Sequence, residues 1–347
     1  MIDDAKFSIV IPVYKNQDTI EHTLDSAFSQ DYKNFEVIIS NDGSGIDYSY
    51  LLEKYPELII YNNCKNGGPG IARQRAIDYA VTGDWVLFLD ADDVLYDNSV
   101  LSTLTKYTRL HSRKINVLTG IYFVYKQNIP KPTVYDSMFG PLHAKCFRVS
   151  FLKENNIRFR EDMFYFEDLY FNILFSLIDK TRYRGKSIVK VNKVLYKQIE
   201  RDNSITTSEY EGDNPYFIAG FKTLEKIYTL MYESNDIGLT DDDKKMLIIV
   251  LILIMCNYIG GKRFNPPIDL SNLSMEAEDV LRRMTVHIKK LYEYEDDIIT
   301  NFDSVFNVYN PFFPEFYKQM IVLLYSYTHK DPVTVKNILE KCINEYM

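Results

Sequence analysis

Residues 85–93 read WVLFLDADD, five apolar side chains followed by carboxylates at three of the next four positions. An unbroken apolar run of this kind predicts a strand buried on both faces, as in a parallel sheet. Asp90, Asp92 and Asp93 then arrive together where the strand must end, and like charges so close repel one another and cost desolvation. A hard cation such as Mg²⁺ or Mn²⁺ would remove that cost. The alternative is an acidic turn that caps the next helix.

Upstream segments predict further strands and helices in alternation. The predicted strands are Phe7–Val13, Phe35–Ser40 and Leu58–Tyr61, and the predicted helices are Gln17–Gln30, Asp47–Tyr55 and Ile71–Ala80. Pro12 cannot donate to a ladder, so the first strand is expected to fray there. Alternation at this pace indicates an α/β fold with a doubly wound, mostly parallel sheet.

Polar residues follow three of the predicted strands. Tyr14 follows the first, Asp42 the second, and Asp90–Asp93 the strand that begins at Trp85. In open α/β sheets, ligands bind outside the carboxyl ends of the strands. The three features therefore predict one binding site at that edge.

A glycine-rich loop, NGGPG at 66–70, precedes a predicted helix that carries Arg73 and Arg75. Pro69 suits a helix opening, glycines at a helix amino end can approach phosphate oxygens, and arginines add charge. The alternative is a loop with two solvated arginines, and it is the reading that we favour for Arg75.

The whole-chain properties exclude some classes. The 347 residues carry a net charge of −8, so nucleic acid is not indicated as a partner, although a local basic groove would be compatible with it. The four cysteines form no CxxC pair, which predicts neither a zinc site nor a disulfide framework. The first six residues contain no long apolar stretch, so no signal peptide is expected. The apolar segment Met246–Cys256 is too short to span a bilayer, so no transmembrane segment is expected. We expect a cytoplasmic protein that could be peripheral at the membrane.

The pattern changes after residue 210. Residues 211–215 read as a linker, and helical segments are expected at Tyr216–Tyr232, Asp241–Tyr258, Ser274–Tyr294, Pro314–Tyr327 and Asp331–Tyr346. The predicted domains are therefore a catalytic domain at 1–210 and an α-helical carboxy-terminal domain at 211–347. The second domain could shape an acceptor site or form a homodimer.

Four segments taken together resemble the amino-terminal half of family 2 glycosyltransferases, which have the GT-A fold: SIVIPVY, EVIISNDGS, NGGPGIARQRAI and GDWVLFLDADD. The resemblance continues through Lys145–Arg160, Phe164–Phe171 and Tyr196–Thr206, and so covers about the first 210 residues in family order. It implies an inverting, metal-dependent enzyme that takes a sugar from a nucleotide-diphosphate donor, usually a UDP-sugar.

The resemblance also implies roles for individual residues. Pro12, Tyr14 and Asp42 match positions that hold the nucleotide base, and Arg73 matches the arginine that faces the nucleotide. Asp90 and Asp92 match the DXD motif, in which Asp92 binds Mn²⁺ or Mg²⁺ and Asp90 lies nearer the ribose and sugar. Asn41 stands where the family often has a first aspartate.

Asp168, in the segment FYFEDLYF, matches the family's catalytic base, and Glu167 is expected to orient the site or bond the backbone. The alternative for this pair is the first turn of a helix, where the dipole favours acids. His143, Lys145 and Arg201 are possible donor or acceptor contacts. The alternatives are a structural or surface histidine for His143 and a solvated loop arginine for Arg201, while Lys145 could reach the acceptor or a phosphate.

Three functions follow for the whole chain. The first is sugar transfer to the hydroxyl of a surface glycan or lipid-linked glycan. The second uses the same donor on another acceptor, such as a hydroxymethylated DNA base or a protein. The third is a nucleotide-sugar-binding module without turnover, and the joint presence of Asp42, Asp90, Asp92 and Asp168 argues against it.

Overall fold

The computed structural model describes residues 5–111, 115–126, 131–135 and 141–200, together with positions 223, 226 and 240. By its internal contacts the chain divides into Met1–Arg201 and Asp202–Met347. Arg201, the linker at 211–215 and the helices expected after it lie outside the described residues. The domain boundary at residue 210 therefore stays a prediction.

The first four strands form a parallel half-sheet in the order β3-β2-β1-β4. Their bounds are Phe7–Val13 for β1, Phe35–Asn41 for β2, Ile59–Asn62 for β3 and Trp85–Phe88 for β4. All four confirm the predicted strands to within one residue at each end. β1 does not fray at Pro12, because it pairs with β2 as far as Val13. On its other side β4 pairs with β1 only as far as Val10, so β4 needs no N–H donor from the proline.

The second half makes the sheet mixed rather than mostly parallel. β8 (Lys145–Arg148) pairs antiparallel with both β4 and β6 (Val117–Tyr125), while β9 (Ile188–Ile199) runs parallel to β6. Two short strands, β5 (Val94–Leu95) and β7 (Thr133–Tyr135), add antiparallel pairings to β9 and β6. The reason is connectivity, because the described residues that join β6, β7 and β8 contain no helix, and parallel neighbours need such a crossover.

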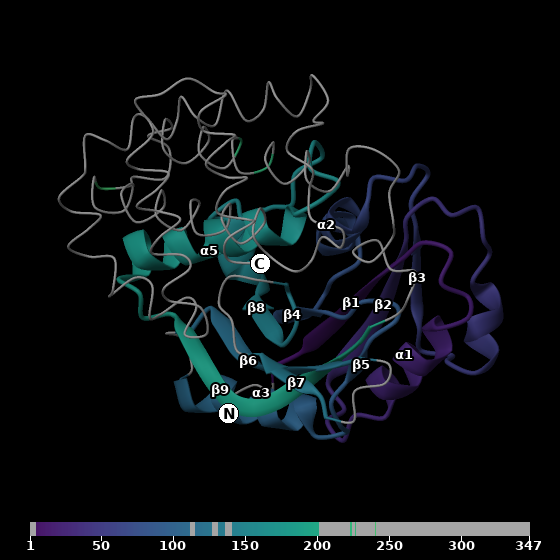
Figure 1. Cartoon of the computed structure of the whole chain (residues 1–347), viewed down its shortest axis with the longest axis horizontal. Helices are drawn as coiled ribbons and strands as arrows, with labels where there is room; N and C mark the ends of the chain where they lie inside the picture. Colours follow the sequence, from purple (N-terminus) through teal and green to yellow (C-terminus); the bar gives the residue numbers. More distant parts are fainter. Residues whose placement is uncertain are drawn as a thin grey trace, which may run out of the picture. The chain divides into compact units, whose positions relative to one another are not determined.

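Helices cover both faces of the sheet (Figure 1). α1 (Ile20–Phe28) and α3 (Val100–His111) lie on one side, and α2 (Pro69–Tyr79) and α5 (Glu167–Tyr183) lie on the other. The helix expected at Asp47–Tyr55 is a 3₁₀ turn, η1, at Ser49–Glu53, and the short α4 spans Val149–Glu154. Within the described residues, no helix is long and apolar enough to cross a bilayer.

An aromatic cluster holds α5 to the sheet. The Phe171 ring stacks on Phe159 at a centroid distance of 4.2 Å and meets Phe88 of β4 and Phe147 of β8 edge-on at 6.2 and 5.3 Å. Phe171 is fully buried. Because α5 begins at Glu167, this cluster fixes the helix that carries the Glu167–Asp168 pair.

Replacing Phe171 by alanine is therefore expected to lower the free energy of unfolding by about 3–5 kcal/mol, since a cavity remains where four rings met. Denaturant unfolding followed by circular dichroism measures the change, with an unaltered slope showing that stability alone has moved. Leu110→Ala, at a side chain that is 75% exposed, is the control and should stay within about 0.5 kcal/mol. A Phe171→Ala cost near that of the control would show that the cluster does not hold the helix.

Candidate active site

The carboxylates after β4 gather around a histidine from another part of the chain. The Nε2 atom of His143 lies 3.3 Å from Oδ2 of Asp90 and 3.7 Å from Oδ2 of Asp93. One ligand atom from each of these three residues falls within 4.8 Å of the others, and this group does not include Asp92. Asp92 is half-buried beside it. The structure thus brings His143 to the strand end where a metal was expected.

Two rings fix the His143 imidazole in place. It stacks on Tyr196 at a centroid distance of 4.3 Å and meets Tyr122 edge-on at 5.2 Å. Its Nδ1 atom is buried with no hydrogen-bond partner among the described residues. The ring therefore presents Nε2 to the carboxylates, as either a proton donor to Asp90 or a ligand atom.

Asp93 is bound by the last described strand. Its Oδ2 accepts a hydrogen bond from the Tyr196 hydroxyl at 2.7 Å, and its Oδ1 accepts one from the Ile199 amide at 2.8 Å. Burial raises the pKa of Asp93 to about 7, and the charges of Asp90 and Asp92 add to that effect, while His143 and Tyr196 oppose it. The sequence did not identify Tyr196, because nothing local signals a partner more than 100 residues away.

The donor set at this strand end suits a divalent cation. Carboxylate oxygens are ligands that both Mg²⁺ and Mn²⁺ accept, and an imidazole nitrogen favours a transition metal such as Mn²⁺. Two sets of ligands could hold it, the expected Asp90 and Asp92 or the group of Asp90, Asp93 and His143. In the second set, both Asp93 oxygens already accept hydrogen bonds, so a cation there would have to compete with Tyr196 and Ile199.

Arg73 is buried between two carboxylates. Its Nη2 donates to Oδ1 of Asp90 at 2.6 Å and its Nη1 donates to Oε1 of Glu167 at 2.8 Å. Burial disfavours the charged guanidinium, but Asp90, Glu167 and Asp168 outweigh it and raise the pKa of Arg73. In turn, Arg73 and His143 overcome burial and hold the pKa of Asp90 well below its usual range. Arg73, which was expected to face the nucleotide, thus uses both terminal nitrogens for hydrogen bonds within the protein.

The acidic pair opens α5, with the two side chains in different surroundings. Glu167 is buried, and burial raises its pKa to about 7 with help from Asp168 and against the pull of Arg73. Asp168 is half-buried, and its Oδ1 accepts a hydrogen bond from the Leu169 amide at 2.7 Å. The acids therefore occupy a helix amino end, as the alternative reading predicts, and Asp168 keeps the solvent access that a catalytic base would need.

Asp42 holds the glycine loop. At the end of β2, its carboxylate accepts hydrogen bonds from the amides of Gly67 at 3.0 and 3.1 Å and of Gly68 at 2.7 Å. Gly68 has φ +85°, a backbone conformation that favours glycine. Burial raises the pKa of Asp42 and the two amides oppose that effect. The structure thus gives Asp42 a local structural role at the predicted edge.

The other expected nucleotide residues lie at the same end of the sheet. Pro12, near the end of β1, is half-buried, and Tyr14 directly after the strand is 44% exposed. The Tyr14 amide donates to the Asn16 side chain at 2.9 Å, which fixes the turn that presents the ring. An exposed, oriented aromatic ring at this edge is a surface on which a planar base could stack.

Lys145 is a buried amine at the start of β8. Its Nζ donates to the Pro141 carbonyl at 2.5 Å. Burial lowers the pKa of Lys145 to about 7, and the negative charge of Asp168 opposes that effect. The residue is 3% exposed, so its amine lies inside the protein.

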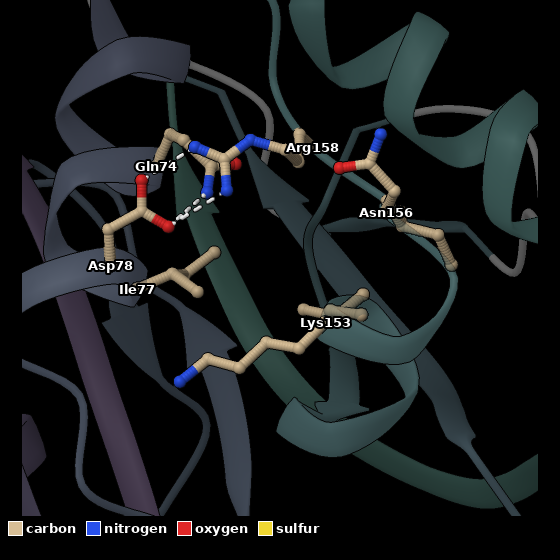
Figure 2. Close-up of a pocket in the computed structure, with 8 residues that line it drawn as sticks. Gln74, Ile77, Asp78, Lys153, Asn156 and Arg158 are labelled. Carbon is tan, nitrogen blue, oxygen red and sulfur yellow. Dashed lines mark hydrogen bonds and ion pairs between the residues drawn. The ribbon is translucent and has the colours of Figure 1, made fainter.

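A separate cavity of about 280 Å³ lies between α2 and the segment that begins with α4 (Figure 2). Its lining residues are Gln74, Ile77, Asp78, Leu152, Lys153, Asn156, Ile157 and Arg158. Arg158 makes two hydrogen bonds with Asp78, at 2.6 and 3.0 Å. None of the candidate site residues lines this cavity, so it does not mark the predicted site.

Comparison with known proteins supports the fold. TarS of Staphylococcus aureus, residues 1–349, solved in complex with UDP-GlcNAc, superposes with a TM-score of 0.68 at 20% identity over 98% of this chain and 91% of that one. The same fold is therefore shown. In sequence, the amylovoran biosynthesis glycosyltransferase AmsB of Erwinia amylovora is 41% identical over 118 residues, which are 32% of this chain and 38% of that protein.

An uncharacterized glycosyltransferase of Rickettsia bellii is 38% identical over 102 residues, 29% of this chain and 15% of that protein. The chain thus spans less than half the length of these two relatives. Residues 8–167, which contain every candidate residue described above except Asp168 and Arg201, match the family described as glycosyl transferase family 2. This segment is somewhat less than half of the chain and resembles glycosyl transferase family 2, and the fold is the GT-A fold.

Proposed function

We propose that the protein transfers a sugar from a UDP-linked donor to an acceptor hydroxyl. One observation carries the proposal: Arg73 binds Asp90 at the end of β4 and Glu167 at the start of α5. This bridge brings the acidic strand end and Asp168 into one site within a family 2 domain. Such a transfer needs two parts: a carboxylate cluster that binds the sugar donor and a solvent-accessible base for the acceptor.

The similar proteins narrow the substrates that deserve the first test. TarS was solved with UDP-GlcNAc, and its name describes a poly(ribitol-phosphate) β-N-acetylglucosaminyltransferase; 229 residues of it are 25% identical to this chain. AmsB is named for amylovoran biosynthesis. The first candidates are therefore UDP-GlcNAc as donor and a hydroxyl-rich surface polymer as acceptor.

The donor site is assigned to the carboxyl ends of β1, β2 and β4. The exposed Tyr14 ring would stack on the base, with Pro12 beside it, while Asp42 shapes the glycine loop through the Gly67 and Gly68 amides. Asp90 would face the ribose and sugar, since its Oδ1 is held by Arg73.

Asp90 and Asp92 would hold Mn²⁺ or Mg²⁺, with Asp93 and His143 as the competing set. When bound, the cation supplies a Lewis acid that stabilises the charge of the departing diphosphate.

Asp168 would act as the base. As the acceptor oxygen forms its bond to the anomeric carbon, the bond from that carbon to the diphosphate oxygen breaks and Asp168 takes the hydroxyl proton. Attack from the face opposite the leaving group inverts the anomeric configuration. His143 lies 3.3 Å from Asp90, and the charge of Asp168 acts on the buried amine of Lys145, so both nitrogen bases would tune this machinery.

The proposal is tested by thermal unfolding against a panel of nucleotide sugars with Mn²⁺, followed by UDP release with poly(ribitol phosphate) and other polyols as acceptors. Asp168→Asn should keep the donor-dependent shift and lose about 10²–10⁴-fold in UDP release, because the amide cannot take the acceptor proton. A fully active Asp168→Asn variant would remove Asp168 from the role. A donor-dependent shift with no UDP release from the wild type would instead favour a binding module without turnover.

Replacing Asp92 by asparagine should raise the Mn²⁺ concentration needed for half of the UDP-dependent thermal shift by at least about 10-fold, since a ligand charge is lost. His143→Gln, which keeps a polar side chain of similar reach, should change that concentration far less. The reverse pattern, with His143→Gln sensitive and Asp92→Asn not, would move the cation to the group of Asp90, Asp93 and His143.

Lys145→Met should remove a pH dependence of stability. The folded pKa is about 7 against 10.5 for the free amine, so between these values the unfolded chain binds the extra proton and wild-type stability rises with pH. Below about pH 7 the amine is charged in both states, and the wild type bears the full cost of burying it. Denaturant midpoints of both proteins at several pH values measure the difference, and a difference that stays flat from about pH 7 to 10 would contradict the buried neutral amine.

A further inference from the structure

The amino end of α5 is in direct contact with the backbone of α2. A Cβ atom placed on Gly70 would lie 2.5 Å from Cγ and 2.9 Å from Cβ of Glu167. Both distances are shorter than real carbon contacts, so only glycine lets α2 approach the Glu167 side chain this closely. The Glu167 stem is therefore confined on the side that faces α2.

The head of the same side chain is confined by Arg73, one turn further along α2. The ion pair to Glu167 measures 2.8 Å between side chains that are 6% and 9% exposed, and the ion pair to Asp90 measures 2.6 Å. The guanidinium carbon also lies 6.0 Å from the Phe88 ring centre and 5.9 Å from that of Phe159. An ion pair so far removed from water depends strongly on its geometry, because neither charge can be solvated in any other arrangement.

The direction of the Glu167 side chain sets that of Asp168. Phe166, just before the helix, has φ +59°, in the left-handed region that non-glycine residues seldom adopt, so the chain enters α5 through a constrained turn. Successive helix residues point about 100° apart. With Glu167 locked inward against Arg73 and Gly70, Asp168 has to point along the half-buried flank.

We propose that Arg73 and Glu167 are positioning residues that fix Asp168 relative to Asp90. The inference rests on the proposed function, in which Asp168 serves the acceptor and Asp90 the donor. One guanidinium then joins the donor-side strand end to the acceptor-side helix, and neither Arg73 nor Glu167 touches the reacting atoms. The pair would act on the turnover number and leave the affinity for the donor nearly unchanged.

The test needs variants that keep the protein folded. Arg73→Met would leave two buried carboxylates without a counter-charge, so its failure to fold would say nothing about position. Arg73→Lys keeps the charge but loses the planar fork that reaches both partners. Glu167→Gln keeps the shape and one acceptor oxygen but loses the charge.

The measurement is UDP release by the full-length wild type, both single variants and the double variant, with Mn²⁺ and the donor and acceptor found above. We expect each single variant to lower kcat by about 10–100-fold with the KM for the donor within about threefold, since misplaced groups lose turnover first. The double variant should be no slower than the worse single variant, because both changes break the same link. Calorimetric titration with UDP and Mn²⁺ shows that each variant keeps the donor site.

Arg158→Lys is the matched control. Arg158 also binds a carboxylate with two hydrogen bonds, to Asp78 on the same helix α2, but it lines the separate cavity and contacts none of the candidate site residues (Figure 2). It should leave both kcat and KM unchanged. A drop in kcat for Arg158→Lys equal to that for Arg73→Lys would mean that any loosening of α2 slows the enzyme, and the positioning role would fall.

The remaining outcomes separate the inference from the function on which it rests. A raised KM with unchanged kcat in Arg73→Lys would place Arg73 in direct contact with the nucleotide and overturn the inference. Multiplying losses in the double variant would show that Arg73 and Glu167 act separately, which also overturns it. A wild type that releases no UDP with any acceptor overturns the proposed function itself, whereas an active wild type with fully active variants overturns only the positioning role.

Discussion

The structure depends on how it compensates acidic side chains that have been taken out of water. Asp42, Asp93 and Glu167 are each less than 10% exposed, and Asp90 lies between Arg73 and His143. A buried carboxylate without partners would cost more than a marginally stable domain can supply. Each acid therefore has its own solution: backbone amides for Asp42, a hydroxyl and an amide for Asp93, and a shared guanidinium for Asp90 and Glu167.

These solutions also join segments that lie far apart in the sequence. The glycine loop is tied to β2, the last described strand is tied to the end of β4, and α5 is tied to α2. All three connections lie at the edge formed by the carboxyl ends of the parallel strands. The interactions that compensate the buried acids therefore also assemble the site. Loss of the partners of one acid would displace a second segment of the chain.

The sequence predicts the part of this arrangement that local pattern controls. Apolar runs locate β1, β2 and β4 because burial on both faces leaves no alternation to misread. The Asp47–Tyr55 helix fails as a prediction because η1 is a single short 3₁₀ turn, and short apolar stretches do not distinguish the two. The sequence does not predict the mixed half of the sheet, because strand direction depends on the connections between strands rather than on their composition.

The pairing of the site residues with one another cannot be predicted from the sequence for a different reason. The sequence singles out His143 as a possible contact but does not show that it pairs with Asp90, and no local pattern marks Tyr196 as the partner of Asp93, because both pairings depend on where β8 and β9 lie in the sheet. Arg73 is recognisable as a site residue from its place after the glycines, but its sequence position cannot reveal that its charge is spent on two carboxylates. Residue type and strand end predict where chemistry occurs, whereas burial and pairing decide which atoms remain free for it.

The charge balance that results bears on the donor. Five carboxyl groups, Asp90, Asp92, Asp93, Glu167 and Asp168, belong to the site, against one guanidinium from Arg73 and one amine, Lys145, whose pKa is near 7. A nucleotide diphosphate is itself an anion, so this set of side chains would repel it at short range. A divalent cation held by the strand-end carboxylates would reverse that repulsion, whereas the charge of Arg73 is already neutralised inside the protein. The burial of Arg73 therefore supports the proposal that the donor binds together with a metal ion.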